Sequence, residues 1–491
     1  MLDTTLPDHI QEFLNRKHGM LIGGKWVRAE AMIDVLDPSN AELISGISDA
    51  SQADVDAAVA AARTAFESDD WRSLAPKERG RMIGRIADMI EAHTEELAYL
   101  ETLDNGKPFG ISRSVDVGAA AGAFRYYAGW ADKIHGTTHN ISMPGEHHAF
   151  TQRDPVGVAA LIVPWNYPLV MAAMKLGPAL AAGCACVLKP AEDTSLSAIR
   201  LGELMMDAGI PSGIVNIVTG YGKTAGAALA EHPGVDKVAF TGSTATGKAI
   251  ARAATGNLKK VTLELGGKSP NIILNDADLE KAIPAAALAV FFNSGQTCTA
   301  VTRLYVQDGV YDQVIEGIAN VAKSLKVGGG FEDDVMIGPL VNATQLSRVT
   351  GYIEKGMQEG GEIITGGSRI GDRGYFVEPT VIRAPRNDMT IVREEIFGPV
   401  IAAQKFSDVD EAIALANDNT YGLSSTIWTQ NISHAHRIAN RLRTGQVAIN
   451  AGAVADWDLP IGGYKQSGWG RESGFEAVTN YLETKAVVVS L

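Results

Sequence analysis

From residue 156 onward, the chain alternates short apolar runs with longer amphipathic segments. The runs are rich in β-branched residues, which is typical of buried strands, and the segments between them carry apolar residues at helical spacing. This alternation predicts parallel sheets of βαβ units. Strands are expected over 156–163, 184–189, 214–220, 237–242, 260–265 and 270–274, and helices over 195–208 and 222–231.

A second series of the same kind follows, and we expect a boundary between two α/β domains near Glu264–Pro270. The chain has 491 residues, more than one hydrophobic core usually supports. The second series has strands over 302–307, 380–382 and 425–430, and helices over 310–325, 346–359 and 433–442.

Two further helices are expected before this alternation, over residues 51–66, where Ser51 and Asp54 form a capping pair, and over 78–103. Residues 137–154 alternate polar and apolar side chains and interrupt the first domain. The terminal residues 486–491 form an apolar strand, which needs an edge to pair with. We expect that edge to be residues 137–154, here or on another subunit.

Charge and hydropathy exclude several classes of protein. The net charge of −14 and pI near 5.2 argue against nucleic-acid or anionic-membrane partners, because a negative surface repels phosphates. The longest apolar stretch, 156–188, is too interrupted by prolines and polar residues to cross a membrane. Residues 1–19 have no apolar run and do not resemble a signal peptide. We therefore expect a cytoplasmic protein.

Only three cysteines occur, so disulfides do not stabilise this chain. Cys184 and Cys186 lie in an apolar run and are interpreted as core residues. Cys298, in NSGQTCTA, follows Gly295, which allows a close turn. A cysteine nucleophile needs a lowered pKa or a nearby base. No HExxH motif, CxxC pair or acidic calcium loop suggests a metal site.

Two motifs offer partners for Cys298. Glu264 closes an apolar strand before two glycines in LELGGKSP, where a desolvated carboxyl group has a raised pKa and can act as a base, although a capping or ion-pair role is equally compatible. In PWNYP, two prolines and a Trp pin the backbone around Asn166, whose amide can then stabilise an oxyanion. A rigid strand-to-helix turn is the alternative interpretation of PWNYP.

Glycine-rich and charged strand ends indicate a dinucleotide site. TGSTATGKA resembles a phosphate-binding loop, but Ala249 stands where a magnesium-binding hydroxyl is needed, so the motif favours pyrophosphate binding at a helix N-terminus. GYGKTAG is only a weak match to a dinucleotide fingerprint. In KPAE, Lys189 and Glu192 can bind an adenosine ribose, and Glu192 would repel a 2′-phosphate, which favours NAD over NADP.

The order of these motifs is more specific than any one of them. PWNYP, KPAE, FTGSTATG, LELGGKSP, GQTC, EEIFGPV and GGYKQSGWGRE together resemble the hydrolytic, tetrameric type of the aldehyde dehydrogenase superfamily, and the resemblance runs from Ile22 to the last strand. It implies an α/β fold with a Rossmann-like cofactor domain (1–136 and 155–264), an α/β catalytic domain (265–470) and a small β oligomerisation arm (137–154 and 471–491).

The resemblance also implies a role for each matching residue. Cys298 is the nucleophile, the Asn166 amide and the Cys298 backbone N–H form the oxyanion hole, and Glu264 activates water. Lys175 and Glu472 match a route by which a proton leaves the site. The NAD site would comprise Trp165, Lys189, Glu192, Gly242, Ser243, Glu395 and Phe397.

The implied reaction is NAD-dependent oxidation of an aldehyde to a carboxylic acid through a thiohemiacetal and a thioester on Cys298. The implied assembly is a homotetramer, a dimer of dimers. Glu483 matches a position that forms a charged contact across the dimer, with Arg471 and Lys260 as partners, one of them on the neighbouring subunit.

Three other functions are less compatible with the sequence. Transfer of the thioester to coenzyme A is disfavoured because Glu264 is present. A nucleoside-triphosphate-binding regulatory protein is disfavoured by Ala249 and by the lack of an acidic metal ligand. A non-catalytic homologue should show damage at Cys298, Glu264 or Asn166, and none is seen.

The substrate is expected to be bulky or aromatic. Met174 and Ile461 stand where acetaldehyde-type relatives carry Trp and Phe, which should widen the aldehyde tunnel, and Ala119 and Ala120 should lie at its mouth. The segment FLNRKHGMLIGGKW is similar to phenylacetaldehyde dehydrogenases of bacterial aromatic catabolism. The expected substrate pocket is Tyr167, Met171, Met174, Phe292, Thr297, Thr299, Trp457 and Ile461.

Overall fold

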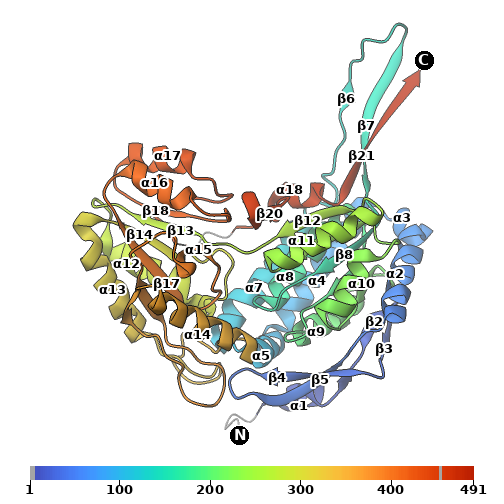
Figure 1. Ribbon diagram of the computed structural model, residues 1–491. Helices are drawn as coiled ribbons and strands as arrows, with labels where there is room; N and C mark the ends of the chain where they lie inside the picture. Colours follow the sequence, from blue (N-terminus) through green and yellow to red (C-terminus); the bar gives the residue numbers. More distant parts are fainter. Residues whose placement is uncertain (1–5, 453–455) are drawn as a thin grey trace.

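The computed structural model of the chain describes residues 6–452 and 456–491 and shows two α/β lobes side by side, with a β arm that projects from them (Figure 1). Residues 1–5, part of the segment we interpreted as unlike a signal peptide, lie outside the described residues. In the described part of the chain, no helix is both long and apolar enough to span a membrane.

The first lobe contains an eight-stranded sheet whose centre is parallel, as the alternation predicts. Strands β12, β11, β8, β9 and β10 form this centre, and the edge strands β20, β2 and β3, which we did not predict, join it antiparallel. In sheet order the strands are β20 (Gly468–Trp469), β12 (Lys260–Glu264), β11 (Lys237–Thr241), β8 (Val158–Ile162), β9 (Ala185–Lys189), β10 (Val215–Ile217), β2 (Met20–Ile22) and β3 (Lys25–Val27).

Helices cover this sheet because their apolar faces need burial. Cys184 and Cys186 are buried in the same core, which confirms their structural interpretation. Ala120 is also fully buried there, so it does not lie at the mouth of a tunnel. The helices include α2 (Gln52–Glu67), α4 (Pro76–Ala92), α5 (Thr94–Asn105), α7 (Gly118–Ala128), α8 (Pro168–Ala182), α9 (Leu196–Asp207), α10 (Ala227–Glu231) and α11 (Thr244–Ala253).

The single helix expected over residues 78–103 is two helices, α4 and α5. The backbone leaves the helical region at His93 (φ −112°, ψ 27°), whose ring nitrogen lies 2.8 Å from the Met89 carbonyl. Both helices keep apolar residues at helical spacing, so the periodicity alone does not reveal the break.

The second lobe contains a seven-stranded sheet, parallel except for the edge strand β15. Its strands are, in sheet order, β15 (Glu362–Thr365), β16 (Thr380–Arg383), β17 (Val400–Phe406), β14 (Arg303–Gln307), β13 (Pro270–Ile273), β18 (Thr426–Trp428) and β19 (Ala448–Ile449). Its main helices are α12 (Leu279–Phe291), α13 (Tyr311–Ser324), α14 (Ala343–Gln358), α16 (Val409–Asn417) and α17 (Ile432–Arg441). Between Glu264 and Pro270 the chain passes from β12 of the first sheet to β13 of the second.

The arm is an antiparallel sheet in which β21 (Leu482–Ser490) pairs with β7 (His147–Pro155) along its whole length, and β6 (Thr138–His139) flanks β7. The expected pairing of the C-terminal strand with residues 137–154 is thus found within one chain. The strand begins at Leu482, earlier than residue 486. Helix α18 (Gly474–Thr479), which we placed in the arm, buries Ala477 and Val478 in the core of the first lobe.

A small three-stranded sheet of β1 (Lys17–His18), β5 (Glu42–Ser48) and β4 (Met32–Asp37) lies beside helix α1 (Asp8–Leu14) near the N-terminus (Figure 1). Its core contains Leu100 and Leu103 of α5. This small sheet therefore packs against the end of α5 and supports it. The segment that follows α5 lies next to the candidate active site.

Candidate active site

A cavity of about 210 Å³ brings together residues from both lobes at the carboxyl edge of the first sheet. Parallel strands of βαβ units all end at one such edge, which is where ligands bind in open α/β sheets. The loops after β8, β11 and β12 reach the cavity from the first lobe, and the loops around Cys298 and Glu395 reach it from the second. Its lining includes the predicted residues Trp165, Asn166, Met171, Gly242, Ser243, Glu264, Cys298, Glu395 and Phe397.

Cys298 stands on a tightly turned loop after α12. Asn293 and Ser294 adopt left-handed backbone angles (φ 50° and 56°), and Gly295 continues the turn at φ 72°. A Cβ at Gly295 would lie 2.0 Å from the Gly398 carbonyl oxygen, so only glycine fits there. The loop leaves Cys298 partly exposed to the cavity.

The thiol of Cys298 is neutral in this environment. Burial, followed by the nearby Glu264 and Glu395 carboxyl groups, raises its pKa to about 12. A cysteine nucleophile needs either a lowered pKa or a nearby base, and the pKa of Cys298 is not lowered. A base or a positively charged group must therefore assist its ionisation.

Asn166 is buried and is held against the loop of Cys298. Its side-chain Nδ2 donates a 2.8 Å hydrogen bond to the Gln296 carbonyl, and Asn166 also lines the cavity. An amide nitrogen carries two hydrogens, so one N–H is used to orient the group and the second is left for a ligand.

Glu264, the last residue of β12, is a buried carboxyl group. Burial, then the neighbouring Glu472, raises its pKa well above the ordinary value, while Lys175 and Arg471 oppose that shift. Its Oε1 has no hydrogen-bond partner among the residues that the structure describes. Behind it, the buried Lys175 ammonium contacts the Glu472 carboxylate. An unpartnered carboxyl oxygen with a raised pKa suits a general base.

The same cavity also has the groups that a dinucleotide needs. Ser243 is the N-cap of α11, and its Oγ accepts a hydrogen bond from Thr246 N at 3.2 Å, so backbone N–H groups converge beside Gly242. Glu395 accepts a hydrogen bond from Gly267 N at 2.9 Å, and burial raises its pKa to about 7. The rings of Trp165 and Phe397 meet edge to face, with centroids 5.3 Å apart.

Lys189 and Glu192 lie at the end of β9, on the same edge of the sheet but outside the lining of the cavity. The Lys189 ammonium lies 2.9 Å from Glu192 Oε2. Burial acts to raise the pKa of Glu192, but Lys189 and backbone N–H groups lower it below the ordinary value. The carboxylate is therefore ionised and able to accept hydrogen bonds from hydroxyl groups.

The residues predicted to form an aldehyde pocket are only partly brought together. Met171 lines the cavity with Cys298, and Tyr167 Oη lies 2.9 Å from Thr297 Oγ1, next to Cys298 in the chain. Met174 is buried in α8. The partly exposed Phe292, Thr299, Trp457 and Ile461 do not line this cavity.

Two residues of α14, Gln345 and Arg348, also line the cavity, and sequence analysis missed them. Gln345 Nε2 donates to the Phe397 carbonyl at 2.6 Å, and Arg348 donates to the carbonyls of Glu395 and Ile396. They hold the EEIFGPV loop, in which Phe397 has a φ of 60°. Their three-residue spacing puts them on one helix face, but nothing in the sequence indicates which loop that face meets.

Comparisons with known proteins find relatives along nearly the whole chain. The model of the aldehyde dehydrogenase family matches residues 26–487. The chain is 46% identical over 485 residues to a phenylacetaldehyde dehydrogenase of Pseudomonas fluorescens, with 97% of each chain covered. It is 47% identical over 472 residues to an aldehyde dehydrogenase of Emericella nidulans, with 96% of this chain and 94% of that one covered.

Solved structures give the same result for the fold. An aldehyde dehydrogenase from Bacillus cereus, solved as its NAD+ complex, superposes with a TM-score of 0.97 at 47% identity, with 99% of both chains covered. Both the family model and the relatives extend over nearly the whole chain, so the match includes the two lobes and the arm. The chain belongs to the aldehyde dehydrogenase family.

Proposed function

We propose that the protein oxidises an aldehyde to the carboxylic acid with NAD, through a thioester on Cys298. The observation that carries this proposal is the cavity that Cys298, Asn166 and Glu264 share with Glu395 and Phe397. It joins a nucleophile, an oxyanion donor and a base to a surface suited to a nicotinamide ring. A binding protein would not need the first three groups together.

In the first step, the sulfur of Cys298 attacks the carbonyl carbon of the aldehyde, and its thiol proton passes to hydroxide from the solvent, as the raised pKa of the thiol requires. The carbonyl π bond breaks, and the negative charge on its oxygen is held by the free N–H of Asn166 and by the Cys298 backbone N–H. An oxyanion donor of this kind contributes about 3–4 kcal/mol to the transition state. The product is a thiohemiacetal alkoxide. Glu395 and Phe397 would hold the nicotinamide end of NAD, which would supply the hydride acceptor, and loss of the hydride from this carbon leaves a thioester on Cys298.

In the second step, Glu264 takes a proton from water, and the resulting hydroxide attacks the thioester carbon. The carbon–sulfur bond breaks, the acid leaves, and Cys298 is regenerated. The unpartnered Oε1 of Glu264 supports this role, because a water molecule is free to bond there. Lys175 and Glu472 lie behind the carboxyl group and would carry the proton away.

Residues in the cavity and on the same edge of the first sheet fit NAD. The backbone N–H groups at Ser243 would hold the pyrophosphate, Lys189 and Glu192 the adenosine ribose, and Glu395 and Phe397 the nicotinamide ribose and ring. A Cβ at Gly266 would lie 2.2 Å from a Glu395 carboxyl oxygen, so glycine allows the Glu395 carboxyl group to lie against the end of β12. The NAD+ complex of the Bacillus cereus relative supports the choice of cofactor.

For the substrate, we infer a bulky or aromatic aldehyde such as phenylacetaldehyde. The support is that one relative is a phenylacetaldehyde dehydrogenase. Met174 and Ile461 are smaller than the Trp and Phe expected in acetaldehyde-type relatives, but neither lines the cavity around Cys298. Steady-state kinetics with acetaldehyde, hexanal, benzaldehyde and phenylacetaldehyde, each with NAD and NADP, test this inference. A kcat/KM for phenylacetaldehyde at least tenfold above that for acetaldehyde is expected. A higher value for acetaldehyde would overturn the substrate class but not the reaction.

We also infer a cytoplasmic homotetramer with an NAD-binding domain over 1–136 and 155–264, a catalytic domain over 265–470, and an arm over 137–154 and 471–491. The packing of α18 favours moving residues 471–481 to the first of these. The exposed valines Val488 and Val489 and the exposed Leu491 support an arm that is covered by another subunit.

A further inference from the structure

Behind the PWNYP loop lies a buried ion pair for which the proposed chemistry has no use. Lys107 Nζ is 2.6 Å from Asp116 Oδ2, and neither side chain has any exposed surface. Neither residue lines the cavity. Removing two charges from water costs free energy before their attraction is counted, so a fully buried pair is weak evidence for stability and a structural role in holding its neighbours is worth testing.

The backbone at the end of α5 and in the turn before α7 places Lys107 and Asp116 next to each other. Lys107 follows Gly106, which ends α5 at φ 84° and whose Cβ would lie 2.5 Å from Pro339. Asp116 lies in a π-helical turn, Ser112–Val117, between the short helix α6 (Phe109–Ile111) and α7. This turn buries Asp116 while its neighbour Val115 stays exposed. Such turns in helices frequently occur at functional sites.

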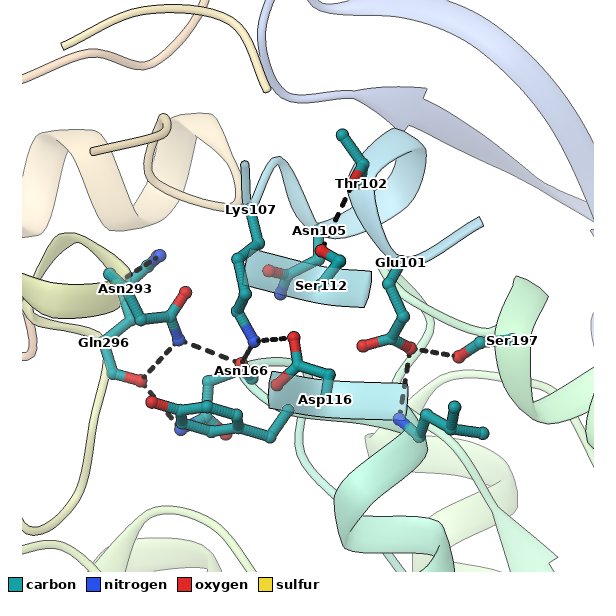
Figure 2. Close-up of polar contacts among 12 residues, drawn as sticks. Glu101, Thr102, Asn105, Lys107, Ser112, Asp116, Asn166, Ser197, Asn293 and Gln296 are labelled. Atoms are coloured by element: carbon teal, nitrogen blue, oxygen red, sulfur yellow. Dashed lines mark hydrogen bonds and ion pairs between the residues drawn. The ribbon is translucent and has the colours of Figure 1, made fainter. Parts of the chain in front are cut away.

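The ammonium of Lys107 reaches the main chain of the PWNYP loop (Figure 2). It lies 3.4 Å from the Asn166 carbonyl oxygen, to which it donates, and 4.0 Å from the centroid of the Tyr167 ring. The three N–H donors of an ammonium therefore have three acceptors: the Asp116 carboxylate, the Asn166 carbonyl and the ring face of Tyr167.

Two asparagines hold the same stretch of backbone. Asn293 Nδ2 donates to the Asn166 carbonyl at 3.0 Å, and Asn105 Nδ2 donates to the Trp165 carbonyl at 2.7 Å. The peptide planes on both sides of Asn166 are thus held by side chains from α5, from the segment after it and from the Cys298 loop. Figure 2 shows the contacts that Lys107 and Asn293 make with Asn166. The side chain of Asn166 is held at its other end by the Gln296 carbonyl.

We propose that the Lys107–Asp116 pair is a positioning device for the oxyanion amide: it fixes the Asn166 carbonyl and so aims the free N–H of Asn166 at the reacting carbonyl oxygen. The inference rests on the proposed function, in which Asn166 is the oxyanion donor. A misplacement of about 1 Å in such a group lowers the rate about 100-fold. Lys107 and Asp116 do not line the cavity, so they act through Asn166.

The test separates positioning from stability with three variants. Lys107→Met removes the donor and leaves Asp116 unpaired, so both kcat and Tm should fall, kcat by about 10- to 100-fold. Lys107→Met/Asp116→Leu replaces the pair with apolar groups, which should restore Tm but leave kcat low. Lys259→Met is the control: this buried lysine donates to the Ala230 and His232 carbonyls, outside the cavity, and its loss should lower Tm without changing kcat.

A merely structural pair predicts that the double variant recovers kcat together with Tm, and that result would overturn the inference. Wild-type kcat in Lys107→Met would also overturn it. If Lys107→Met does not fold, the double variant still gives the decisive comparison. The Kd for NAD should stay within about twofold in every variant, since none of these residues lines the cavity.

A double-mutant cycle with Asn166→Ala distinguishes this inference from the proposed function. Asn166→Ala alone should lower kcat by about 100- to 1,000-fold. In that background, Lys107→Met should cost less than about threefold more, because the group that it positions is gone. Full activity of Asn166→Ala would mean that the proposed oxyanion role is wrong. If Asn166→Ala is impaired, and adding Lys107→Met lowers kcat by the same factor as it does in the wild type, the positioning inference alone is wrong.

Discussion

Lys260 Nζ lies 2.9 Å from Glu483 Oε2 within one chain, and it donates a second bond of 2.9 Å to the Leu482 carbonyl. The first residue of β12, the strand that ends at Glu264, is thereby tied to the base of the arm. Arg471 makes no ion pair with Glu483 in residues 6–452 and 456–491, and instead donates to the Gly463 and Gly470 carbonyls. Of the two expected partners, Lys260 is thus the one in the same chain, and Arg471 remains the candidate across the subunit interface.

Reversing the charge at Glu483 should therefore disturb the site more than the fold. Both side chains of the Lys260 pair are about half exposed, so Glu483→Lys should change the free energy of unfolding by less than about 1 kcal/mol. It should leave a tetramer with weaker NAD binding and lower activity, since two like charges then meet beside β12. Sedimentation velocity and NAD titration measure both effects, with Glu483→Gln as the control. If the Glu483→Lys variant forms an intact tetramer with wild-type NAD affinity, Glu483 does not have this role. If the wild-type protein sediments as a monomer, the inferred tetramer is wrong.

Cys298→Ala should abolish dehydrogenase activity, with a loss of at least about 1,000-fold, because no other group can form the thioester. NAD binding should be unchanged, since the pyrophosphate and ribose sites lie elsewhere. Stopped-flow NADH absorbance and a fluorescence titration give the two quantities. Cys184→Ala is the matched control: Cys184 is buried in the core, so that variant should lose stability but keep its kcat. The assignment fails if Cys298→Ala keeps a tenth of wild-type turnover.

Glu264→Gln should stop the reaction at the acyl-enzyme. Hydride transfer then gives a burst of at most one NADH per subunit, and the Cys298 peptide gains the mass of the acyl group. Mass spectrometry of the quenched protein detects this adduct. Addition of coenzyme A to the trapped enzyme should release nothing, which separates hydrolysis from acyl transfer to a thiol. Sustained turnover near the wild-type rate would exclude Glu264 as the base.

The pH profile should follow from the raised pKa of Glu264. Only the carboxylate is a base, and burial raises its pKa, so the base form is lost as the pH falls through a value well above that of an ordinary Glu. The deacylation rate should accordingly rise with pH through a range above that in which an ordinary Glu titrates. In Glu264→Gln this dependence should disappear, whereas the burst rate should still rise with pH, because the Cys298 thiol has a pKa of about 12. A deacylation rate that is flat from about pH 6 to 9 would contradict the prediction.

Cofactor selection should depend on Glu192. Its carboxylate, paired with Lys189, is ionised and would repel a 2′-phosphate. Glu192→Gln should raise the ratio of kcat/KM for NADP to that for NAD by about tenfold or more, and Lys189 is then free to meet the phosphate. Asp193→Asn is the control, because it removes a neighbouring carboxylate that already has a side-chain partner: Asp193 accepts a hydrogen bond from Asn342 at 3.2 Å. An unchanged ratio would show that Glu192 does not face the ribose.

Local sequence patterns were sufficient to predict the strands whose ends carry the site residues. Apolar runs bounded by glycine predicted β8, β9, β11 and β12, and the residues after these strands had to meet at one edge because parallel strands end together. Glu264 and Asn166 could therefore be grouped from the sequence alone, and the order of the motifs added Cys298. Strand β17 was missed, because AAQKF mixes small and polar residues and is buried only through its neighbours β14 and β16.

What the sequence determined by itself is thus the chemistry: the residue types, their order and the strand ends on which they stand. Only the tertiary structure decided the pKa values of these residues and the contacts that hold them in place, because both depend on groups distant in the chain. The Cys298 thiol has a raised pKa because the site is buried and Glu264 and Glu395 converge on it. Likewise, Lys107 reaches the Asn166 carbonyl across 59 positions of the chain, a contact that no periodicity encodes, because it exists only once α5 and the PWNYP loop are packed together.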